Sequence, residues 1–143
     1  MTFLKTAALL VLLNISLVLA ISDSRALTKY RLGWATGDTE IIMSVVNNAS
    51  YTFTWLPNNN VVSARDFPQF FEGFKNSIVS VTNQKFFLVF DNMIQRKING
   101  ALYEAGDWIV DGFGRGTYFN IAKNGLVSWE IATQSQLQSQ PQV

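Results

Sequence analysis

The middle of the chain consists of short apolar runs separated by turn residues. "TEIIMSVV" (Thr39–Val46) precedes two asparagines, and "YTFTWL" (Tyr51–Leu56) alternates in polarity and stops at "PNNN". "SIVSVT" (Ser77–Thr82) places apolar side chains toward both faces, and "KFFLVF" (Lys85–Phe90) is continuously apolar. Runs of this length, bounded by Pro and Asn, are typical of β-strands. We therefore predict four short strands here, and the last should be a central one.

The clearest pair of strands surrounds Asn124-Gly125. This dipeptide is favoured in two-residue hairpin turns because both of its positions accept positive φ. The residues on either side alternate in character, as paired strands do. Pairing across the turn would give one face five large apolar side chains, those of Phe119, Ile121, Val127, Trp129 and Ile131.

One segment departs from the strand pattern. In "RDFPQFFEGFKN" the phenylalanines stand at 67, 70, 71 and 74, which is the spacing of one helical face. Asp66 is a suitable N-cap, and Pro68 is tolerated in a first turn because its missing N–H would be unpaired there. The pattern predicts a short helix near 66–75 with its four rings in the core. An aromatic face exposed for a partner is the alternative.

These elements predict an all-β domain, either a β-sandwich or another arrangement of antiparallel sheets, with that single short helix. The chain contains no cysteine, so no disulfide can support it. Its core must therefore be held by the burial of aromatic and branched side chains. We place this single domain at residues 21–132.

The two ends of the chain have a different composition. Lys5 is the only charge before Asp23, and residues 6–20 form an apolar run with small residues at Val18 and Ala20. That run is short for a membrane span but suits a signal peptide, with an uncleaved anchor as the alternative. We expect residues 1–20 to be removed, and the secreted chain to have no membrane attachment. Residues 133–143, rich in Gln and Ser, predict a disordered tail.

Charge and composition exclude several functions. Without Lys5 the chain has 10 basic and 10 acidic residues, so its formal net charge falls from +1 to zero. A neutral chain with scattered charges lacks the basic surface that nucleic acid requires. The absence of cysteine and histidine removes thiol nucleophiles, imidazole acid–base chemistry and the usual zinc ligands. We predict no catalytic residue, no metal and no cofactor.

The glycines of "DGFGRG" raise the question of a phosphate-binding loop. Such a loop opens a helix, whereas Gly112, Gly114 and Gly116 precede the strand "TYFNI". These glycines are better explained as residues that allow a tight connection between two strands. The connection also carries Arg115, which could meet an anion. We therefore name Gly112, Gly114, Arg115 and Gly116 as a possible binding rim.

Other candidate sites have weaker patterns. Asp107 and Asp111 would lie roughly 13 Å apart along a strand, which is too far for a catalytic carboxylate pair. More distant partners such as Glu104, Glu130 or Asp38 remain open. Asn48-Ala49-Ser50 is a possible glycosylation site in a predicted loop. The four tryptophans should anchor the core, with a sugar-stacking platform as the alternative.

Three segments together resemble the insect family named after multiprotein bridging factor two. They are "YRLGWATGDTEII", "FPQFFEGFKNSIVSVTNQ" and "NGALYEAGDWIVDGFGRGTYFNIAKNGLVSWEIAT". The likeness covers about residues 30–132 and rests on short motifs: Gly33 to Gly37-Asp38, Asn76 to Val79, Gly100-Ala101, the glycine-rich stretch and Gly125-Leu126. The chain departs from the family pattern at Asn83-Gln84, where an acidic residue is usual, and at "DGFGRG", where a double glycine is usual.

The resemblance implies a small secreted β-rich protein without established catalytic residues, of the kind found in saliva or haemolymph. We accordingly expect a non-enzymatic extracellular module that binds a protein or a small ligand. A carbohydrate-binding module that uses Trp and Asn is one alternative. A transcription coactivator, as the family name implies, is another, although a leader and zero net charge fit a nuclear role poorly.

Overall fold

A mixed sheet and three α-helices form the part of the chain that the computed structural model describes, which is the backbone of residues 2–137 and the side chains of residues 5–11 and 22–135. The helices are α1 (Thr2–Thr36), α2 (Thr39–Met43) and α3 (Phe67–Thr82), with a 3-10 turn at Leu56–Asn58. The strands are β1 (Thr52–Trp55), β2 (Asn60–Ser63), β3 (Val89–Ile98), β4 (Ala101–Val110), β5 (Gly114–Lys123), β6 (Leu126–Ala132) and β7 (Gln136–Leu137).

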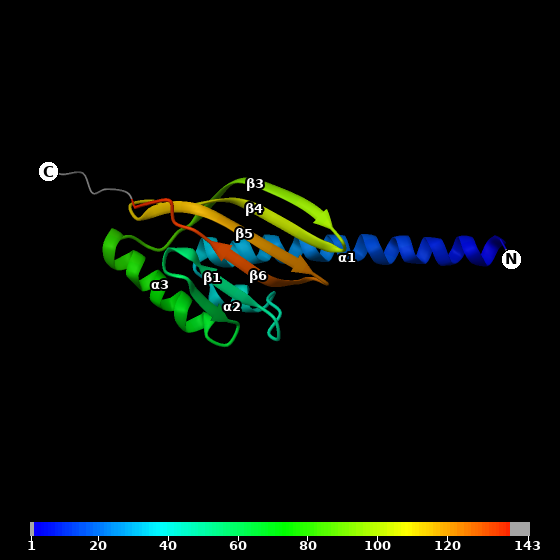
Figure 1. Cartoon of the computed structure of the whole chain (residues 1–143), viewed down its shortest axis with the longest axis horizontal. Helices are drawn as coiled ribbons and strands as arrows, with labels where there is room; N and C mark the ends of the chain where they lie inside the picture. The colour runs from blue at the N-terminus through cyan, green and yellow to red at the C-terminus, as the bar shows by residue number, and fades with distance from the viewer. Residues whose placement is uncertain (1, 138–143) are drawn as a thin grey trace.

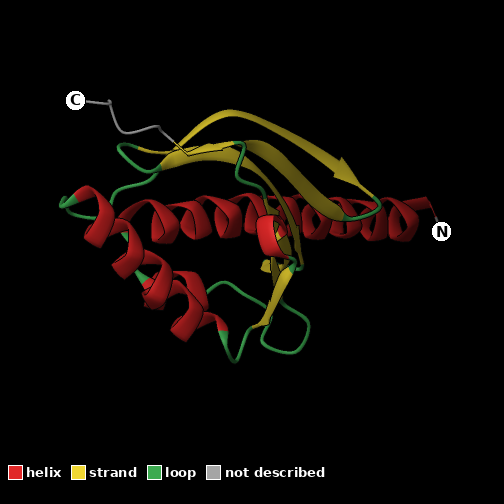
Figure 2. Cartoon of the chain, turned by 60° about the vertical axis from the view of Figure 1, so that its left-hand side comes forward, coloured by secondary structure: helices red, strands yellow, loops and turns green. Residues whose placement is uncertain are grey.

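The strands form one sheet in the order β2-β1-β6-β5-β4-β3, and β7 pairs with β5. β1 runs parallel to β6, whereas the other pairs are antiparallel. The long strands curve over α1, and α3 lies at one end of the assembly (Figures 1 and 2). The predicted all-β fold, and the β-sandwich in particular, is therefore wrong, because helices and not a second sheet cover the inner face.

Helix α1 supplies most of that cover, although the sequence pattern predicts no helix there. Its buried side chains include Asp23, Leu27, Tyr30 and Trp34, a spacing of three to four residues that presents one helical face to the sheet. The helix ends before Gly37, whose φ of 72° suits a residue without a β-carbon.

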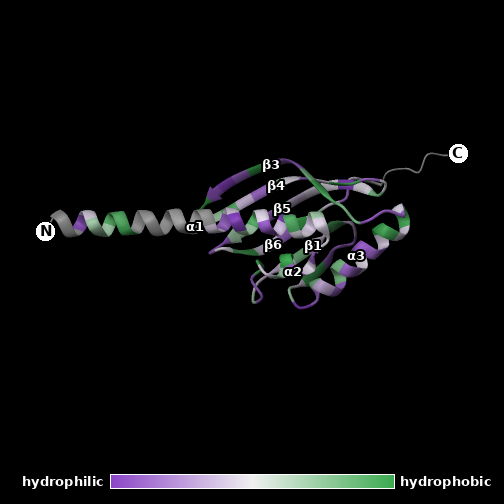
Figure 3. Cartoon of the chain, turned by 180° about the vertical axis from the view of Figure 1, so that it is seen from behind, coloured by the Kyte–Doolittle hydropathy of each residue, from purple (hydrophilic) through white to green (hydrophobic). Residues whose placement is uncertain are grey.

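The N-terminal part of α1 projects beyond the sheet and carries apolar residues (Figures 1 and 3). Leu9, Leu10 and Val11 are all exposed. Within the described residues, no helix combines the length and hydropathy that crossing a membrane requires. Among the described side chains of α1, the buried ones begin at Asp23, which lies after the predicted cleavage point. Cleavage after Ala20 and secretion stay predictions.

Two predicted strands are helical. Residues 39–43 form α2, because the Asp38 carboxylate accepts a hydrogen bond of 3.0 Å from the Ile41 N–H and caps the helix. The predicted helix at 66–75 is confirmed, but it runs on through the predicted strand at 77–82. The apolar stripe of Phe67 and Phe71 continues to Ile78, which outweighs the β-branched residues beside it.

The other strand predictions have mixed outcomes. The strand at 51–56 is confirmed as β1. The run at 85–90 mostly precedes β3, which is an edge strand and not a central one. Phe86 and Leu88 are buried there without belonging to the sheet, which explains why the run is so apolar.

The hairpin at Asn124-Gly125 is confirmed, with φ of 54° and 76° at the two turn residues. The strand register shifts by one residue between Ile121 and Ala122. As a result Val127 lies opposite Ala122 and on the inner face, not on the face predicted to carry Phe119 and Trp129. Val127 is fully buried, whereas Phe119 and Trp129 pair edge to face at 5.6 Å, both only half-buried. The inner face of β5 instead carries Tyr118, Asn120 and Ala122, all buried.

The predicted tail begins with ordered residues. The Thr133 N–H donates to the Thr117 carbonyl at 2.8 Å, and the Ser135 N–H donates to the Arg115 carbonyl at 2.9 Å. The rest of the tail from residue 138 onward lies outside the described residues.

Candidate functional site

Three polar side chains lie in a row across the inner face of the sheet. Glu104 on β4 pairs with Asn120 on β5, which pairs in turn with Glu130 on β6. All three are buried, with exposed fractions of 0%, 1% and 4%. Neighbouring strands are about 4.8 Å apart, so the two glutamates stand roughly 10 Å apart with the asparagine between them. Buried carboxyl groups are costly unless they are paired, so each needs partners.

Glu130 receives a hydrogen bond from α1, and a residue before β1 extends the network. The Tyr30 hydroxyl donates a short hydrogen bond to Glu130 Oε2. Because Tyr30 uses its only proton there, the Tyr51 hydroxyl is the donor in the 2.6 Å bond between the two tyrosines. Burial and the adjacent Glu130 carboxylate raise the pKa of both tyrosines well above the usual value, so both stay protonated donors.

Burial also dominates the charge state of Glu130. Loss of hydration raises the pKa of Glu130 to about 8. The hydrogen bond from Tyr30 and the nearby Trp34 indole act in the opposite direction and lower the pKa, but their effect is smaller. The negative charge of Glu104 adds to the rise. The Trp34 N–H lies near the carboxyl without making a hydrogen bond, and it has no partner among the described residues. Glu130 can therefore exchange a proton near neutral pH.

Glu104 has a different environment. The Arg31 guanidinium forms an ion pair with Glu104 Oε2, and the Gln95 amide donates to the same oxygen at 2.6 Å. The Tyr118 hydroxyl donates to Oε1 at 3.1 Å. Burial, followed by the Glu104 charge, raises the pKa of Tyr118. Glu104 is thus held by three donors and fixes the orientation of Tyr118.

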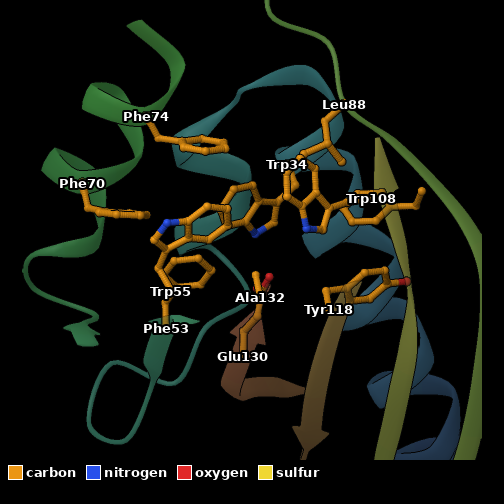
Figure 4. Close-up of a pocket in the computed structure, with 11 residues that line it drawn as sticks. Trp34, Phe53, Trp55, Phe70, Phe74, Leu88, Trp108, Tyr118, Glu130 and Ala132 are labelled. Atoms are coloured by element: carbon orange, nitrogen blue, oxygen red, sulfur yellow. The ribbon is translucent and has the colours of Figure 1, made fainter. Parts of the chain in front are cut away.

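Glu130 and Tyr118 border a small cavity whose walls are otherwise apolar (Figure 4). The Glu130 side chain rises from β6 toward the indole rings above it (Figure 4). The cavity volume is about 20 Å³, which is room for a single water molecule. The aromatic walls come from Trp34, Phe53, Trp55, Phe70, Phe74 and Trp108, with Phe90 beside them.

An open groove of about 680 Å³ lies on the other side of three of these rings. Trp55, Phe70 and Phe74 line both the groove and the cavity. Their contacts are side chain to side chain, with 5.8 Å between the ring centres of Trp55 and Phe74. Rotation of these rings would connect the cavity to the groove.

The glycine-rich stretch forms the corner between β4 and β5, as predicted. Gly112 has a φ of 75° in the turn, and Gly114 and Gly116 lie in β5. A β-carbon on Gly116 would stand 1.7 Å from the Thr133 carbonyl oxygen, which also accepts the Trp108 N–H at 2.8 Å. Close packing therefore requires Gly116, which lies opposite Trp108 of the cavity wall in the β4–β5 pair, whereas none of the four rim residues lines the cavity itself. A binding role for that rim stays a prediction.

The other predicted positions lie away from the cavity. Asn48 is exposed in the loop before β1, where glycosylation stays a prediction. Asp107 accepts a hydrogen bond of 2.8 Å from Asn92 on the outer face, and Asp111 is exposed in a turn, so the two form no pair. Trp34 and Trp108 are buried, Trp55 packs against the core, and Trp129 faces outward. No group of three metal-binding side chains occurs among the described residues.

Sequence reasoning named Glu104 and Glu130 only as distant partners for Asp107 or Asp111. It did not identify Tyr30 or Tyr51, and it considered Trp34 only as a core anchor or as part of a sugar-stacking platform. Glu104 and Glu130 could have been recognised because each is a carboxylate at an inward position of an apolar strand, which is rare without a buried partner. Tyr30 and Glu130 are 100 residues apart in the chain, so no local pattern joins them.

No family model and no curated protein matches the chain. Among solved structures it is similar to an NTF2-like protein from Cytophaga hutchinsonii, with 14% identity and a TM-score of 0.60 over 78% of this chain and 93% of that one. It is also similar to a provisionally named ketosteroid isomerase from Kribbella flavida, with 10% identity and a TM-score of 0.58 over 85% and 84% of the two chains. A third is a provisionally named SnoaL-like polyketide cyclase from Shewanella putrefaciens, with 12% identity and a TM-score of 0.58 over 78% and 79%.

These likenesses establish an NTF2-like fold, in which a curved sheet encloses helices. They also correct the expectation that the chain is not an enzyme, because solved structures with this fold carry the names of isomerases and cyclases. At these identities they establish no substrate and no residue role, so the function has to be argued from the cavity itself.

Proposed function

We propose that the chain is an acid–base enzyme that moves a proton on a small, neutral and largely apolar molecule carrying one carbonyl group. The observation that carries the proposal is the single buried carboxyl group of Glu130 at the wall of an aromatic cavity. Aromatic walls bind apolar rings and exclude water, which strengthens every polar contact inside. The carboxyl group supplies the chemistry.

Glu130 has the properties of a proton carrier. A catalytic group works best when its pKa lies near the working pH, and the pKa of Glu130 is raised to about 8. As a carboxylate it removes a proton from the carbon beside the carbonyl, and as a carboxylic acid it returns that proton to another atom of the same molecule. The Tyr30 hydroxyl holds the carboxyl in place throughout.

The reaction also requires a hydrogen-bond donor for the carbonyl oxygen, and Trp34 can supply it. Removal of the proton leaves negative charge on the carbonyl oxygen, and a positioned N–H donor stabilises that charge in a dry site. The Trp34 N–H is buried beside Glu130 and has no partner among the described residues. Because it lies beside the carboxyl but outside hydrogen-bond geometry, it can donate to a substrate oxygen placed next to Glu130. The substrate reaches this position when the Trp55, Phe70 and Phe74 rings move aside.

Proton exchange at carbon tests the proposal without knowledge of the natural substrate. The full chain is incubated in deuterium oxide with 2-tetralone, a flat bicyclic ketone, and deuterium uptake beside the carbonyl is followed by nuclear magnetic resonance. We expect the chain to accelerate uptake and Glu130→Gln to lower the enzymatic rate about 10²- to 10⁴-fold. The exposed Glu40 provides the matched control, since Glu40→Gln should leave the rate unchanged. Equal rates for wild type and Glu130→Gln would exclude Glu130 as the proton carrier.

A further inference from the structure

The open groove outside the cavity has the wall chemistry of a sugar site. Its volume of about 680 Å³ is in the range of small-molecule sites. Four aromatic side chains line it, those of Trp55, Phe70, Phe74 and Phe113. Its polar lining consists of Asn58, Asn60, Asp66, Gln69, Ser77 and Gln134. The groove therefore combines flat apolar rings with amide groups.

The charge of the groove selects for a neutral ligand. Among the described residues that line it, Asp66 is the only charged side chain, so an anionic ligand would find no cation. Each amide can both donate and accept hydrogen bonds. A hydroxyl group does the same, so amides and hydroxyls pair in either direction. A molecule with several hydroxyl groups and no charge matches this lining.

Gln134 adds an independent sign that a polar ligand belongs in the groove. Its Nε2 atom is buried and has no hydrogen-bond partner among the described residues. Such a buried donor is costly to leave unpaired, and protein structures rarely do so. A ligand hydroxyl in the groove would accept from it. The Asn60 and Gln69 side chains are exposed beside the same space.

The groove and the cavity share one aromatic wall. Phe70 and Phe74 stack with 6.4 Å between ring centres and 12° between ring planes, and Trp55 packs against Phe74. Once the Trp55, Phe70 and Phe74 rings move aside, a ligand with an apolar ring and a hydroxylated part would span both spaces, with the ring at Glu130 and the hydroxyl groups outside. We propose that the groove binds the neutral sugar of a glycoside whose apolar part enters the cavity. This inference rests on the proposed function of the cavity.

Two probes that differ only in the sugar test the inference. The dissociation constants of 2-naphthol and of 2-naphthyl β-D-glucoside are measured by calorimetry with the full chain. We expect the glucoside to bind at least about tenfold more tightly, as one or two added hydrogen bonds predict. Asn60→Ala combined with Gln69→Ala should remove that gain and leave 2-naphthol binding unchanged. Gln84→Ala, an exposed glutamine outside the groove, is the matched control and should change neither.

The results separate this inference from the proposed function. If the glucoside binds no more tightly than 2-naphthol, or if the double variant weakens both probes equally, the sugar site is wrong. Deuterium exchange that depends on Glu130 would still stand in that case. If exchange does not depend on Glu130 while the glucoside keeps its advantage, the groove binds sugar and the proposed reaction is wrong.

Discussion

At Glu130, two opposing effects act on one carboxyl group. Burial favours the protonated form, whereas the Tyr30 hydroxyl and the Trp34 N–H favour the ionised form. Burial is the larger effect, so the carboxyl keeps its proton to about pH 8. A glutamate in the unfolded chain loses its proton near pH 4.3. The folded protein therefore holds one more proton than the unfolded chain between these two values.

That difference predicts how stability depends on pH. The contribution of Glu130 is complete below about pH 4.3 and is lost as the pH rises toward about 8, with a slope of up to about 1.4 kcal/mol per pH unit. Glu130→Gln cannot ionise and should lack this loss. Urea unfolding at several pH values measures it. The free energy of unfolding of wild type should fall relative to Glu130→Gln between pH 5 and 8, and parallel curves would contradict the raised pKa.

The sequence indicates which residue types are unusual but not which of them meet. Glu104 and Glu130 stand at inward positions of apolar strands, and each could be noticed for that reason. Their relation through Asn120 depends on strand order and register, which distant residues determine. The outward position of Trp129 has the same origin, because alternation identifies two faces without showing which one the helices cover.

At the scale of elements, local chemistry predicts structure where it is strong. The Asn124-Gly125 turn specifies its own hairpin, and the phenylalanine spacing from Phe67 specifies the first turns of α3. The β-branched residues of 77–82 predict a strand, yet the packing of Ile78 keeps the segment helical. The sequence pattern predicts no helix for the C-terminal half of α1, where apolar residues alternate with charged ones such as Arg31, which pairs with Glu104.

Substitution of alanine for glycine should destabilise the protein at one position and stabilise it at another. A methyl group on Gly116 would overlap the Thr133 carbonyl, so Gly116→Ala must separate β5 from the segment after β6. We expect a loss of more than about 4 kcal/mol or an unfolded chain. Gly73 lies in α3 with nothing within 4 Å of its added β-carbon, so Gly73→Ala should stabilise by about 0.5–1 kcal/mol. Chemical denaturation of both variants checks this, and a well-folded Gly116→Ala would contradict the packing described.

At the scale of the whole molecule, the fold creates a dry space that no single segment encodes. Helix α1 contributes Tyr30 and Trp34, β6 contributes Glu130, and α3 contributes the rings that close the space. These elements are distant in the chain, so the cavity and its raised pKa follow only from their assembly. Composition excluded histidine and cysteine chemistry, but it left open a carboxyl group whose pKa the fold adjusts.

The central claim is that the assembled molecule keeps the Glu130 carboxyl protonated at neutral pH. Infrared difference spectra between wild type and Glu130→Gln, recorded across pH, report the carbonyl stretch of this one protonated carboxyl group. We predict a band that disappears with a midpoint of about 8 in the folded protein and near 4.3 in urea. A folded-state midpoint near 4.3 would contradict the account, because Glu130 would then be an ordinary carboxylate.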